Sequence, residues 1–206
     1  MSEYKDYNWR NDGFSHAHSY LIPALIDMLP NDGSPILDLG CGNGAIANYL
    51  LDQGFDVYGI DASETGIALA KTKHPERFFI HDVSTDALPE PLQEIPFKTI
   101  ISTEVIEHLY SPRKYIQFCS DILIQSGGGA LIISTPYHGF LKNLALSIFN
   151  AWDSHFTVLW DGGHIKFWSY KTLGVLLREY DFKSLAFKGC GRLPYLWKSM
   201  IIKAEI

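Results

Sequence analysis

Two carboxylates and an imidazole lie close together in the segment TEVIEHL. Glu104, Glu107 and His108 follow directly after the apolar run Thr99–Ile101, which is typical of a buried strand. On a helix, positions i, i+3 and i+4 project from one face, so we expect the three groups to meet. Such a set could hold a hard divalent cation such as Mg²⁺, or the imidazole could act as a general base.

A fourth ligand is available later in the chain. His164 stands in DGGHIKF, where the preceding glycine pair would let the backbone approach closely. We therefore name Glu104, Glu107, His108 and His164 as candidate metal ligands and candidate catalytic residues. Three alternatives remain open: the glutamates favour a helix N-terminus, Glu104 and His108 form an ordinary i,i+4 pair, and His164 pins its loop by hydrogen bonds.

A glycine-rich turn, LDLGCGNGA, follows a different short apolar run. Its glycines, Gly40, Gly42 and Gly44, would allow the backbone to approach a ligand closely. The spacing also fits the G-x-G-x-x-A fingerprint of dinucleotide-binding proteins. The glycines alone therefore do not decide which cofactor is bound.

Three acidic residues, each at the end of one of three successive predicted strands, favour one cofactor. Asp38 would repel the pyrophosphate of a dinucleotide but would suit S-adenosylmethionine, which carries an ammonium and a sulfonium. Asp61 could accept both ribose hydroxyls, and Asp82 the adenine amino group, while the Val83 amide addresses the ring. The alternative is that Asp38 is a capping residue beside a simple tight turn. We expect the neighbouring Cys41 and Ala62 to belong to the same cofactor site.

The elements that position these residues alternate along the chain. We expect strands over residues 34–40, 55–61, 77–82, 97–103, 129–136, 182–190 and 198–206, and helices over 15–30, 45–54, 63–74, 112–128 and 169–181. This alternation predicts an α/β fold with a doubly wound sheet and helices on both faces. In such sheets ligands bind at the carboxyl ends of the strands.

The motifs ILDLGCGNG, GIDAS and FIHDVS resemble the first three motifs of the class I S-adenosylmethionine-dependent methyltransferases. The resemblance runs from about residue 34 to the C-terminus. It implies a Rossmann-like seven-stranded sheet whose order reverses between the first and fourth strands and whose last strand is antiparallel. It also implies that Ser102 and Thr103, which end the fourth strand, line the methyl-donor pocket.

The segment TEVIEHL is similar to the E-x-x-E-H segment of the UbiG-type quinone-biosynthesis O-methyltransferases and of methyltransferases that act on the 2'-hydroxyl of small RNAs. In the RNA group, two acids, the histidine and a later histidine hold Mg²⁺. The resemblance implies the same role here for Glu104, Glu107, His108 and His164.

We expect one methyltransferase domain over residues 1–206. It comprises an N-terminal substrate-side extension (1–33), a cofactor-binding core (34–135), a lid insertion (136–168) and a closing helix and strands (169–206). Aromatic residues of the extension and the insertion could cover an apolar acceptor, or could each simply pack their own segment: Trp9, Phe14, Tyr20, Trp152, Phe156 and Trp160. Further candidate proton acceptors are His16, His18 and His138, with an ordinary loop role as the alternative.

Composition narrows the class of protein. The chain has 206 residues, a formal charge of −6 and three cysteines without metal-type spacing. The acidic balance disfavours a nucleic-acid partner, and Cys41, Cys119 and Cys190 suggest neither a disulfide framework nor a zinc site. The polar N-terminus and the lack of a long apolar run predict a cytoplasmic protein without a transmembrane segment.

The sequence thus predicts an enzyme that transfers a methyl group from S-adenosylmethionine to a small phenolic or quinol-like acceptor, with or without a divalent metal. S-adenosylhomocysteine would be the product. The alternatives are an RNA 2'-O-methyltransferase and a regulatory module that binds S-adenosylmethionine without chemistry. The acceptor, the attacked atom (oxygen, carbon or nitrogen) and the oligomeric state stay open.

Overall fold

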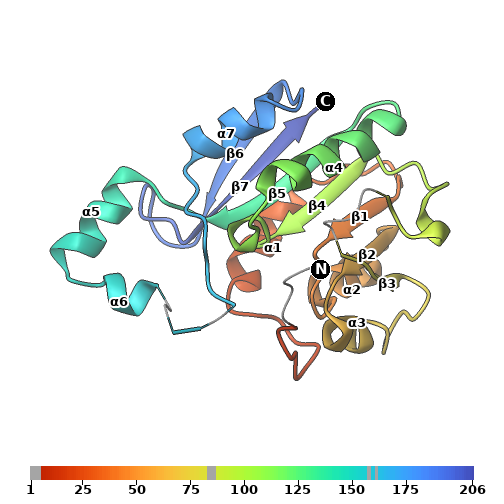
Figure 1. Ribbon diagram of the computed structural model, residues 1–206, viewed down its shortest axis with the longest axis horizontal. Helices are drawn as coiled ribbons and strands as arrows, with labels where there is room; N and C mark the ends of the chain where they lie inside the picture. The colour runs from red at the N-terminus through yellow and green to blue at the C-terminus, as the bar shows by residue number, and fades with distance from the viewer. Residues whose placement is uncertain (1–5, 83–86, 157–158, 161) are drawn as a thin grey trace.

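A seven-stranded sheet forms the centre of the computed structural model, which describes residues 6–82, 87–156, 159–160 and 162–206 (Figure 1). The strands are β1 (Ile36–Leu39), β2 (Val57–Asp61), β3 (Phe78–Ile80), β4 (Thr99–Thr103), β5 (Ala130–Pro136), β6 (Ser184–Cys190) and β7 (Ser199–Glu205). Their order is β3-β2-β1-β4-β5-β7-β6, so it reverses between β1 and β4. Strands β1 to β5 pair in parallel, and β7 runs antiparallel to both β5 and β6. The predicted topology is confirmed.

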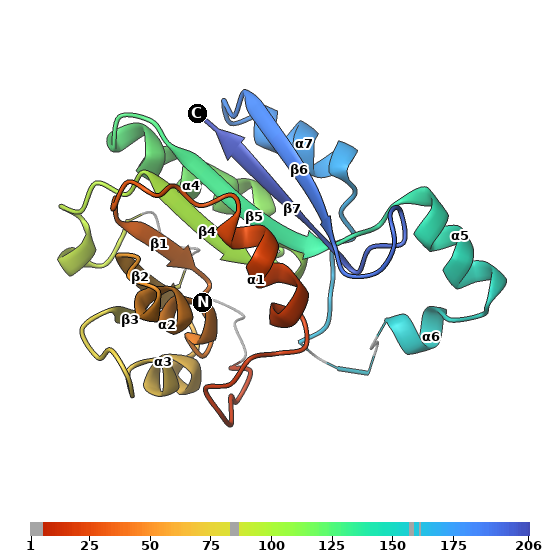
Figure 2. The same ribbon diagram turned by 180° about the vertical axis from the view of Figure 1, so that it is seen from behind.

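Helices cover both faces of the sheet. The helices of the described residues are α1 (His18–Ile26), α2 (Ala45–Asp52), α3 (Glu64–Ala70), α4 (Pro112–Gln125), α5 (Phe140–Ile148), α6 (Trp152–His155) and α7 (Tyr170–Arg178), with 3₁₀ turns η1 (Glu90–Leu92) and η2 (Ile106–His108). Helices α4 and α7 lie on the face seen in Figure 1, and α1, α2 and α3 lie on the opposite face, seen in Figure 2. The predicted doubly wound arrangement is therefore present.

Two hydrophobic cores result because successive strand residues point to opposite faces. In β4, Ile100 packs into the core that contains Tyr115 of α4, and Ile101 packs into the core that contains Leu25 of α1. Burial of each such aliphatic side chain contributes roughly 1.5–3 kcal/mol, so the two cores hold the strand ends at a fixed edge.

Capping residues and a glycine mark helix boundaries that the sequence predicts. The Ser63 hydroxyl accepts a hydrogen bond from the Gly66 amide and caps α3, while Ser169 and Thr172 form a capping box at the start of α7. Gly54 follows α2 with a φ of 88°, a left-handed value typical of the residue after a helix.

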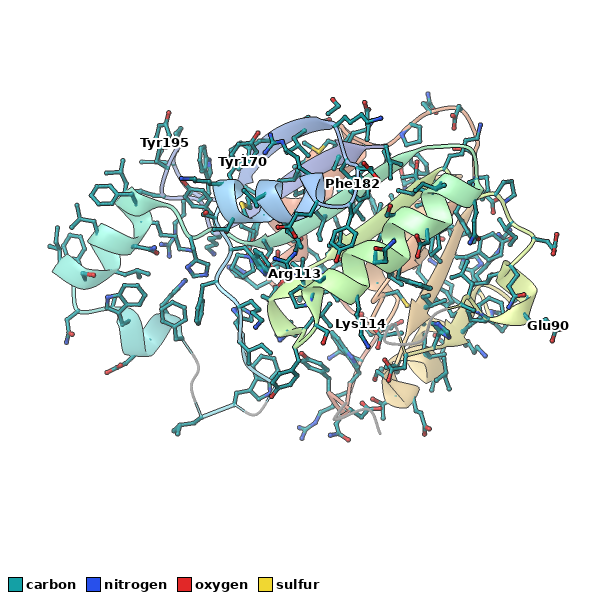
Figure 3. The ribbon with its side chains drawn as sticks, turned by 45° about the horizontal axis from the view of Figure 1, so that its top comes forward. Glu90, Arg113, Lys114, Tyr170, Phe182 and Tyr195 are labelled. Atoms are coloured by element: carbon teal, nitrogen blue, oxygen red, sulfur yellow. The ribbon has the colours of Figure 1, made fainter. Side chains whose placement is uncertain are left out.

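Helices α5 and α6 project beyond the edge of the sheet (Figure 1). Beside them runs the loop of residues 191–198, which joins β6 to β7 and from which Tyr195 points outward (Figure 3). This projecting part carries large exposed apolar side chains, among them Phe149, which is 78% exposed. Among the described residues, no helix combines the length and the apolar character that crossing a bilayer requires.

Candidate functional site

The glycine loop turns between β1 and α2 with left-handed backbone at each of its glycines. The φ values of Gly40, Gly42 and Gly44 are 82°, 54° and 73°, a region that strains residues with a Cβ. A Cβ at Gly42 would also lie 2.8 Å from the Trp9 ring. The loop therefore needs glycine both for its own path and for the close approach of the N-terminal segment.

Asp38 is a buried carboxyl group, 1% exposed, and its Oδ1 has no hydrogen-bond partner in the described part of the chain. Burial, and secondarily the charge of Asp61, raise the pKa of Asp38 to about 8. A buried polar atom without a partner costs stability, and a positively charged donor would offset that cost. This position fits the ammonium group that the sequence assigns to it.

Asp61 ends β2 and is held by backbone amides on both sides. Its Oδ2 accepts from Gly42 N at 2.8 Å and its Oδ1 accepts from Ser63 N at 2.7 Å. Burial raises the pKa of Asp61, while these hydrogen bonds oppose the rise. Each oxygen keeps a second lone pair, so the fixed carboxylate can still accept from two ribose hydroxyls.

The other predicted cofactor-binding residues near these acids differ in position and burial. Asp82 follows β3 at the same edge of the sheet as Asp61. Burial lowers the pKa of the neighbouring His81, and the charge of Asp82 opposes part of this effect. Val83 lies outside the described residues. Cys41 packs its thiol into the core beneath α1 and α2, so its backbone alone can face a ligand. Ala62, half-buried, continues from the carboxyl end of β2.

The two residues that end β4 differ from the prediction. Ser102 is fully buried, and its hydroxyl lies 2.6 Å from the Tyr115 hydroxyl, which donates to the Leu39 carbonyl. The alternation of side chains along β4 turns the Ser102 side chain into the core, so only its backbone can face the predicted pocket. Thr103, the next residue, is half-buried at the strand end and remains available.

The prediction that Glu104, Glu107 and His108 project from one face of a helix is wrong. Glu104 has a φ of 55°, which is outside the helical region, and the following turn is the short 3₁₀ turn η2. The Glu104 carboxylate points back to the sheet and accepts from the hydroxyls of Ser134 at 2.9 Å and Ser199 at 3.2 Å. Burial raises the pKa of Glu104 to about 7.

Glu107, His108 and His164 do come together. Their potential ligand atoms all lie within 4.8 Å of one another, and the two imidazole centroids are 4.8 Å apart. Glu107 is 0% exposed, and within the described part of the chain neither of its carboxylate oxygens has a hydrogen-bond partner of good geometry, although the Thr135 hydroxyl is close. Three of the four predicted metal ligands are therefore clustered, without Glu104.

Backbone contacts fix this cluster. The amides of Ile165 and Lys166 donate to the Glu107 carbonyl at 2.9 and 3.0 Å, and His108 Nδ1 lies 3.3 Å from the Gly163 carbonyl. The loop that carries His164 is thus pinned by main-chain bonds rather than by its imidazole.

The electrostatics of the cluster keep its imidazoles neutral. Burial, and then the charge of Glu104, raise the pKa of Glu107 well above its usual range. Burial lowers the pKa of His108. Burial, and then the repulsion that two protonated rings would feel, lower the pKa of His164 to about 4. A divalent cation would offset the free-energy cost of ionising the buried Glu107 carboxyl group, and both neutral imidazoles could bind it.

The donor set decides which metal would fit. One carboxylate and two imidazoles suit a transition-series cation such as Mn²⁺ or Zn²⁺, which accepts imidazole nitrogen, better than Mg²⁺, which prefers oxygen ligands. An oxygen-rich Mg²⁺ site would need Glu104, whose oxygens are held by Ser134 and Ser199.

The N-terminal segment crosses from the glycine loop to this cluster. Asp6 accepts hydrogen bonds from the hydroxyls of Ser63 and Thr65 and from the Thr65 amide. Burial would raise the pKa of Asp6, but these bonds, with one from the Asn8 amide, lower it to about 2. The segment is anchored over the start of α3, beside Asp61.

Tyr7 makes the contact on the other side. Its hydroxyl donates to the Gly162 carbonyl at 3.2 Å, and its ring meets His108 and Trp160 edge-on at centroid distances of 5.8 and 5.5 Å. The sequence prediction missed Asp6 and Tyr7, for which the only signal was their position next to Trp9.

The predicted aromatic cover does not form a single lid. Trp9 and Trp160 reach the site, but Phe14 packs on His18 and Tyr49, and Tyr20 lies beneath the Lys198 ammonium. Trp152 and Phe156 stack with each other, and Phe156 stacks on His138 inside the insertion.

The further histidines are placed apart from the glycine loop. His16 Nε2 contacts the Lys198 ammonium, and His18 Nδ1 accepts from the Ser15 amide at 3.2 Å. Burial, and then the Lys142 charge, lower the pKa of His138 to about 4. His16 and His18 have local contacts at the start of α1, and His138 packs within the insertion.

Comparison with known proteins agrees with this fold. The family described as "Methyltransferase domain" matches residues 14–186. The ubiquinone biosynthesis O-methyltransferase of Caulobacter vibrioides is 33% identical over 120 residues, which cover 57% of this chain and 46% of that protein. The enzyme of the same name from a Ruegeria species is 29% identical over 186 residues, covering 86% and 71%. The chain spans about half the length of most of the curated relatives it matches.

A solved structure shows the same fold. The magnesium protoporphyrin IX methyltransferase of Synechocystis, determined with bound S-adenosylhomocysteine, superposes with a TM-score of 0.63 at 19% identity. The superposition covers 90% of this chain and 80% of that one.

Proposed function

The chain belongs to the family of methyltransferase domains, and from that premise we propose that it methylates a hydroxyl oxygen of a small phenolic or quinol-like acceptor, using S-adenosylmethionine. The observation that carries the cofactor assignment is the buried Asp38, which lies beside the glycine loop and Asp61 and whose Oδ1 has no hydrogen-bond partner among the described residues. S-adenosylmethionine, when bound, supplies a methyl group made electrophilic by its sulfonium.

The residues of the chain would bind, orient and deprotonate. Asp38 and Asp61 hold the cofactor at the ends of β1 and β2, which fixes the direction in which the acceptor must approach. His108 Nδ1 faces the Gly163 carbonyl, which favours a proton on Nδ1 and a lone pair on Nε2. Burial lowers the pKa of His108 and so favours its neutral ring, which can accept the hydroxyl proton where no metal occupies Nε2.

The proposed acceptor is lipophilic. The curated relatives are named as ubiquinone biosynthesis O-methyltransferases, and the insertion over residues 136–168 exposes apolar side chains next to the site. We propose that this insertion and the extension over residues 1–33 cover the acceptor, while residues 34–135 bind the cofactor and residues 169–206 complete the sheet.

We also propose that Glu107, His108 and His164 hold a divalent cation, for which Mn²⁺ fits the donor set better than Mg²⁺. A bound cation would lower the pKa of the acceptor hydroxyl. Calorimetric titration of the metal-free protein with Mn²⁺ tests the site without reference to activity. We expect binding that is lost in Glu107→Gln and kept in Asp121→Asn, an exposed carboxylate on α4.

The function is tested by release of S-adenosylhomocysteine from a panel of alkyl catechols, quinols and short RNAs, each with Mn²⁺, with Mg²⁺ and with chelator. We expect turnover with the lipophilic phenols. Turnover with RNA alone would replace the proposed acceptor, and binding of the cofactor without turnover on any acceptor would favour a regulatory module. Full activity in chelator would remove the metal from catalysis.

A further inference from the structure

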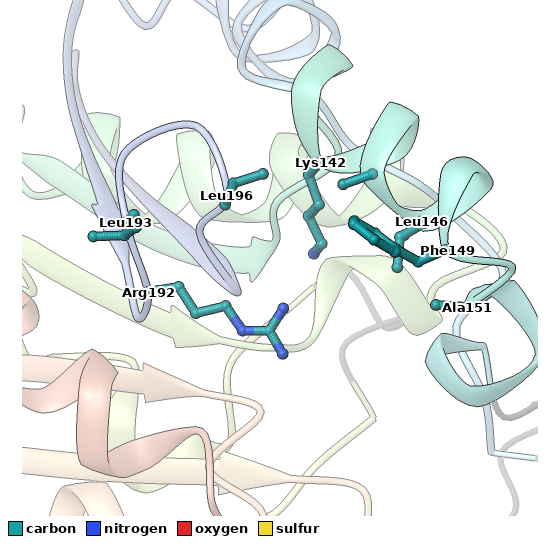
Figure 4. A pocket seen from close by; sticks show the side chains of 8 residues that line it. Lys142, Leu146, Phe149, Ala151, Arg192, Leu193 and Leu196 are labelled. Carbon is teal, nitrogen blue, oxygen red and sulfur yellow. The ribbon is translucent and has the colours of Figure 1, made fainter.

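A groove of about 500 Å³ runs between α5 and the loop of residues 191–198 (Figure 4). Its volume is in the range of small-molecule sites. Most of its lining is apolar, from α5, the residue before α6 and the loop: Ala145, Leu146, Phe149, Ala151, Leu193 and Leu196. Phe149 and Leu193 are 78% and 72% exposed, so the groove presents apolar surface that an apolar occupant would cover.

Two positively charged side chains, Lys142 and Arg192, lie within this apolar lining. Lys142 is 5% exposed, and its ammonium donates to the Lys198 carbonyl at 3.2 Å. The Arg192 guanidinium enters from the loop and forms no ion pair within the described part of the chain. Figure 4 shows both charged ends directed into the same space.

The two like charges repel each other. The charge of Arg192, after burial, lowers the pKa of Lys142, which falls to about 8. Glu104 opposes this effect, but its oxygens already accept from Ser134 and Ser199. An anion between the ammonium and the guanidinium would remove the repulsion and could bind the guanidinium through two parallel hydrogen bonds.

The groove adjoins the proposed reaction site. Lys142 donates to the carbonyl of Lys198, and the next residue, Ser199, donates to Glu104 Oε2 at 3.2 Å. Glu104 in turn precedes the turn that carries Glu107 and His108. A molecule in the groove could therefore place one end near His108 while its apolar body lies along α5.

We propose that the acceptor carries a carboxylate, which is held between Lys142 and Arg192 while its apolar chain fills the groove. This inference rests on the proposed function, because it takes the occupant to be the methyl acceptor. The ligand class is thus an anionic amphiphile with a phenolic hydroxyl, rather than a neutral lipid.

The test compares two alkyl catechols of equal chain length, of which one carries a ring carboxylate. For the wild type we expect KM to be at least tenfold lower for the carboxylate. Arg192→Gln should remove that preference, so that the ratio of the two KM values falls to about one. Lys142→Gln should act in the same direction, and Lys171→Gln, an exposed cation on α7, should keep the preference. Arg192 is exposed, so its variant should fold even where Lys142→Gln does not.

A binding arm separates this inference from the proposed function. Calorimetry uses the carboxylate compound with both hydroxyls already methylated, in the presence of S-adenosylhomocysteine, so no turnover is needed. Binding that is lost in Arg192→Gln supports the anion site even if no phenol is methylated. Equal affinity for the charged and the neutral compound overturns the inference. It is also overturned if the protein does not discriminate between the two catechols but binds anionic phospholipid vesicles in a way that depends on Arg192.

Discussion

The proposed cofactor side and the proposed acceptor side of the site are built in different ways. At the ends of β1 and β2, the proposed cofactor site consists of glycine backbone and two enclosed acids, Asp38 and Asp61, which neighbouring elements hold in place. On the acceptor side, long side chains reach in from α5 and the loop of residues 191–198, among exposed apolar residues. The first side is fixed by the sheet, and the second depends on segments that project from it.

The largest expected effect lies on the cofactor side. Asp61→Ala removes the carboxylate that binds the Gly42 and Ser63 amides and would accept the ribose hydroxyls. Hydrogen bonds to charged groups contribute about 1.5–3 kcal/mol, so we expect S-adenosylhomocysteine to bind about 100-fold more weakly in calorimetry. Asp121→Ala is the control. An affinity within threefold of the wild type would contradict the assignment of Asp61.

This difference between the two sides explains how much the sequence could predict. The cofactor side consists of contiguous motifs at strand ends, so Asp38, the glycines and Asp61 could be placed from the order of elements alone. The cap at Ser63 was equally local. The alternation of strands and helices followed from the spacing of apolar residues, and the strand order followed from the resemblance of the motifs to class I methyltransferases.

The acceptor side depends on tertiary contacts that no local pattern contains. The left-handed backbone at Glu104 turns its carboxylate to Ser134 and Ser199, which come from β5 and β7. Lys142 and Arg192 are 50 residues apart and each stands alone in an apolar stretch. His164 could be predicted because the glycines before it suggested a close approach of the chain.

The second prediction concerns stability on the cofactor side. The pKa of Asp38 is about 8 in the folded protein against 3.8 for an ordinary aspartate, so the folded state binds more protons between these values. Stability of the unliganded protein should therefore fall as pH rises from about 4 to about 8. Asp38→Asn should flatten part of this slope and raise the free energy of unfolding at pH 8 by roughly 1–3 kcal/mol, because the interior relaxes around part of the charge.

Denaturant unfolding at several pH values measures this effect. Glu104 and Glu107 also have raised pKa values and contribute a slope of the same sign, so the comparison is the difference between wild type and Asp38→Asn. Asp121→Asn should leave the slope unchanged. The same Asp38→Asn protein should bind S-adenosylmethionine more weakly, and a variant that loses stability at pH 8 would contradict the role of Asp38.

The third prediction moves to the acceptor side. Phe149→Ser and Leu193→Ser remove exposed apolar surface from the groove, and neither side chain supports the core. We expect each change to raise KM for an alkyl catechol about tenfold, which corresponds to about 1.4 kcal/mol, while affinity for S-adenosylhomocysteine stays the same. Ile124→Ser, on an exposed part of α4, is the matched control. Equal KM values in all four proteins would show that the acceptor binds elsewhere.

The smallest expected effect tests whether the two sides are coupled. The Tyr7 hydroxyl donates to the Gly162 carbonyl, while the same segment is anchored by Asp6 over α3 and covers Gly42 with Trp9. Tyr7→Phe removes this solvent-accessible hydrogen bond, worth about 0.7 kcal/mol, or roughly threefold in an equilibrium constant. If the segment joins the two sides, KM for the catechol and Kd for S-adenosylhomocysteine should both rise by that factor. Tyr170→Phe is the control, and a change in only one constant would mean that Tyr7 serves one side alone.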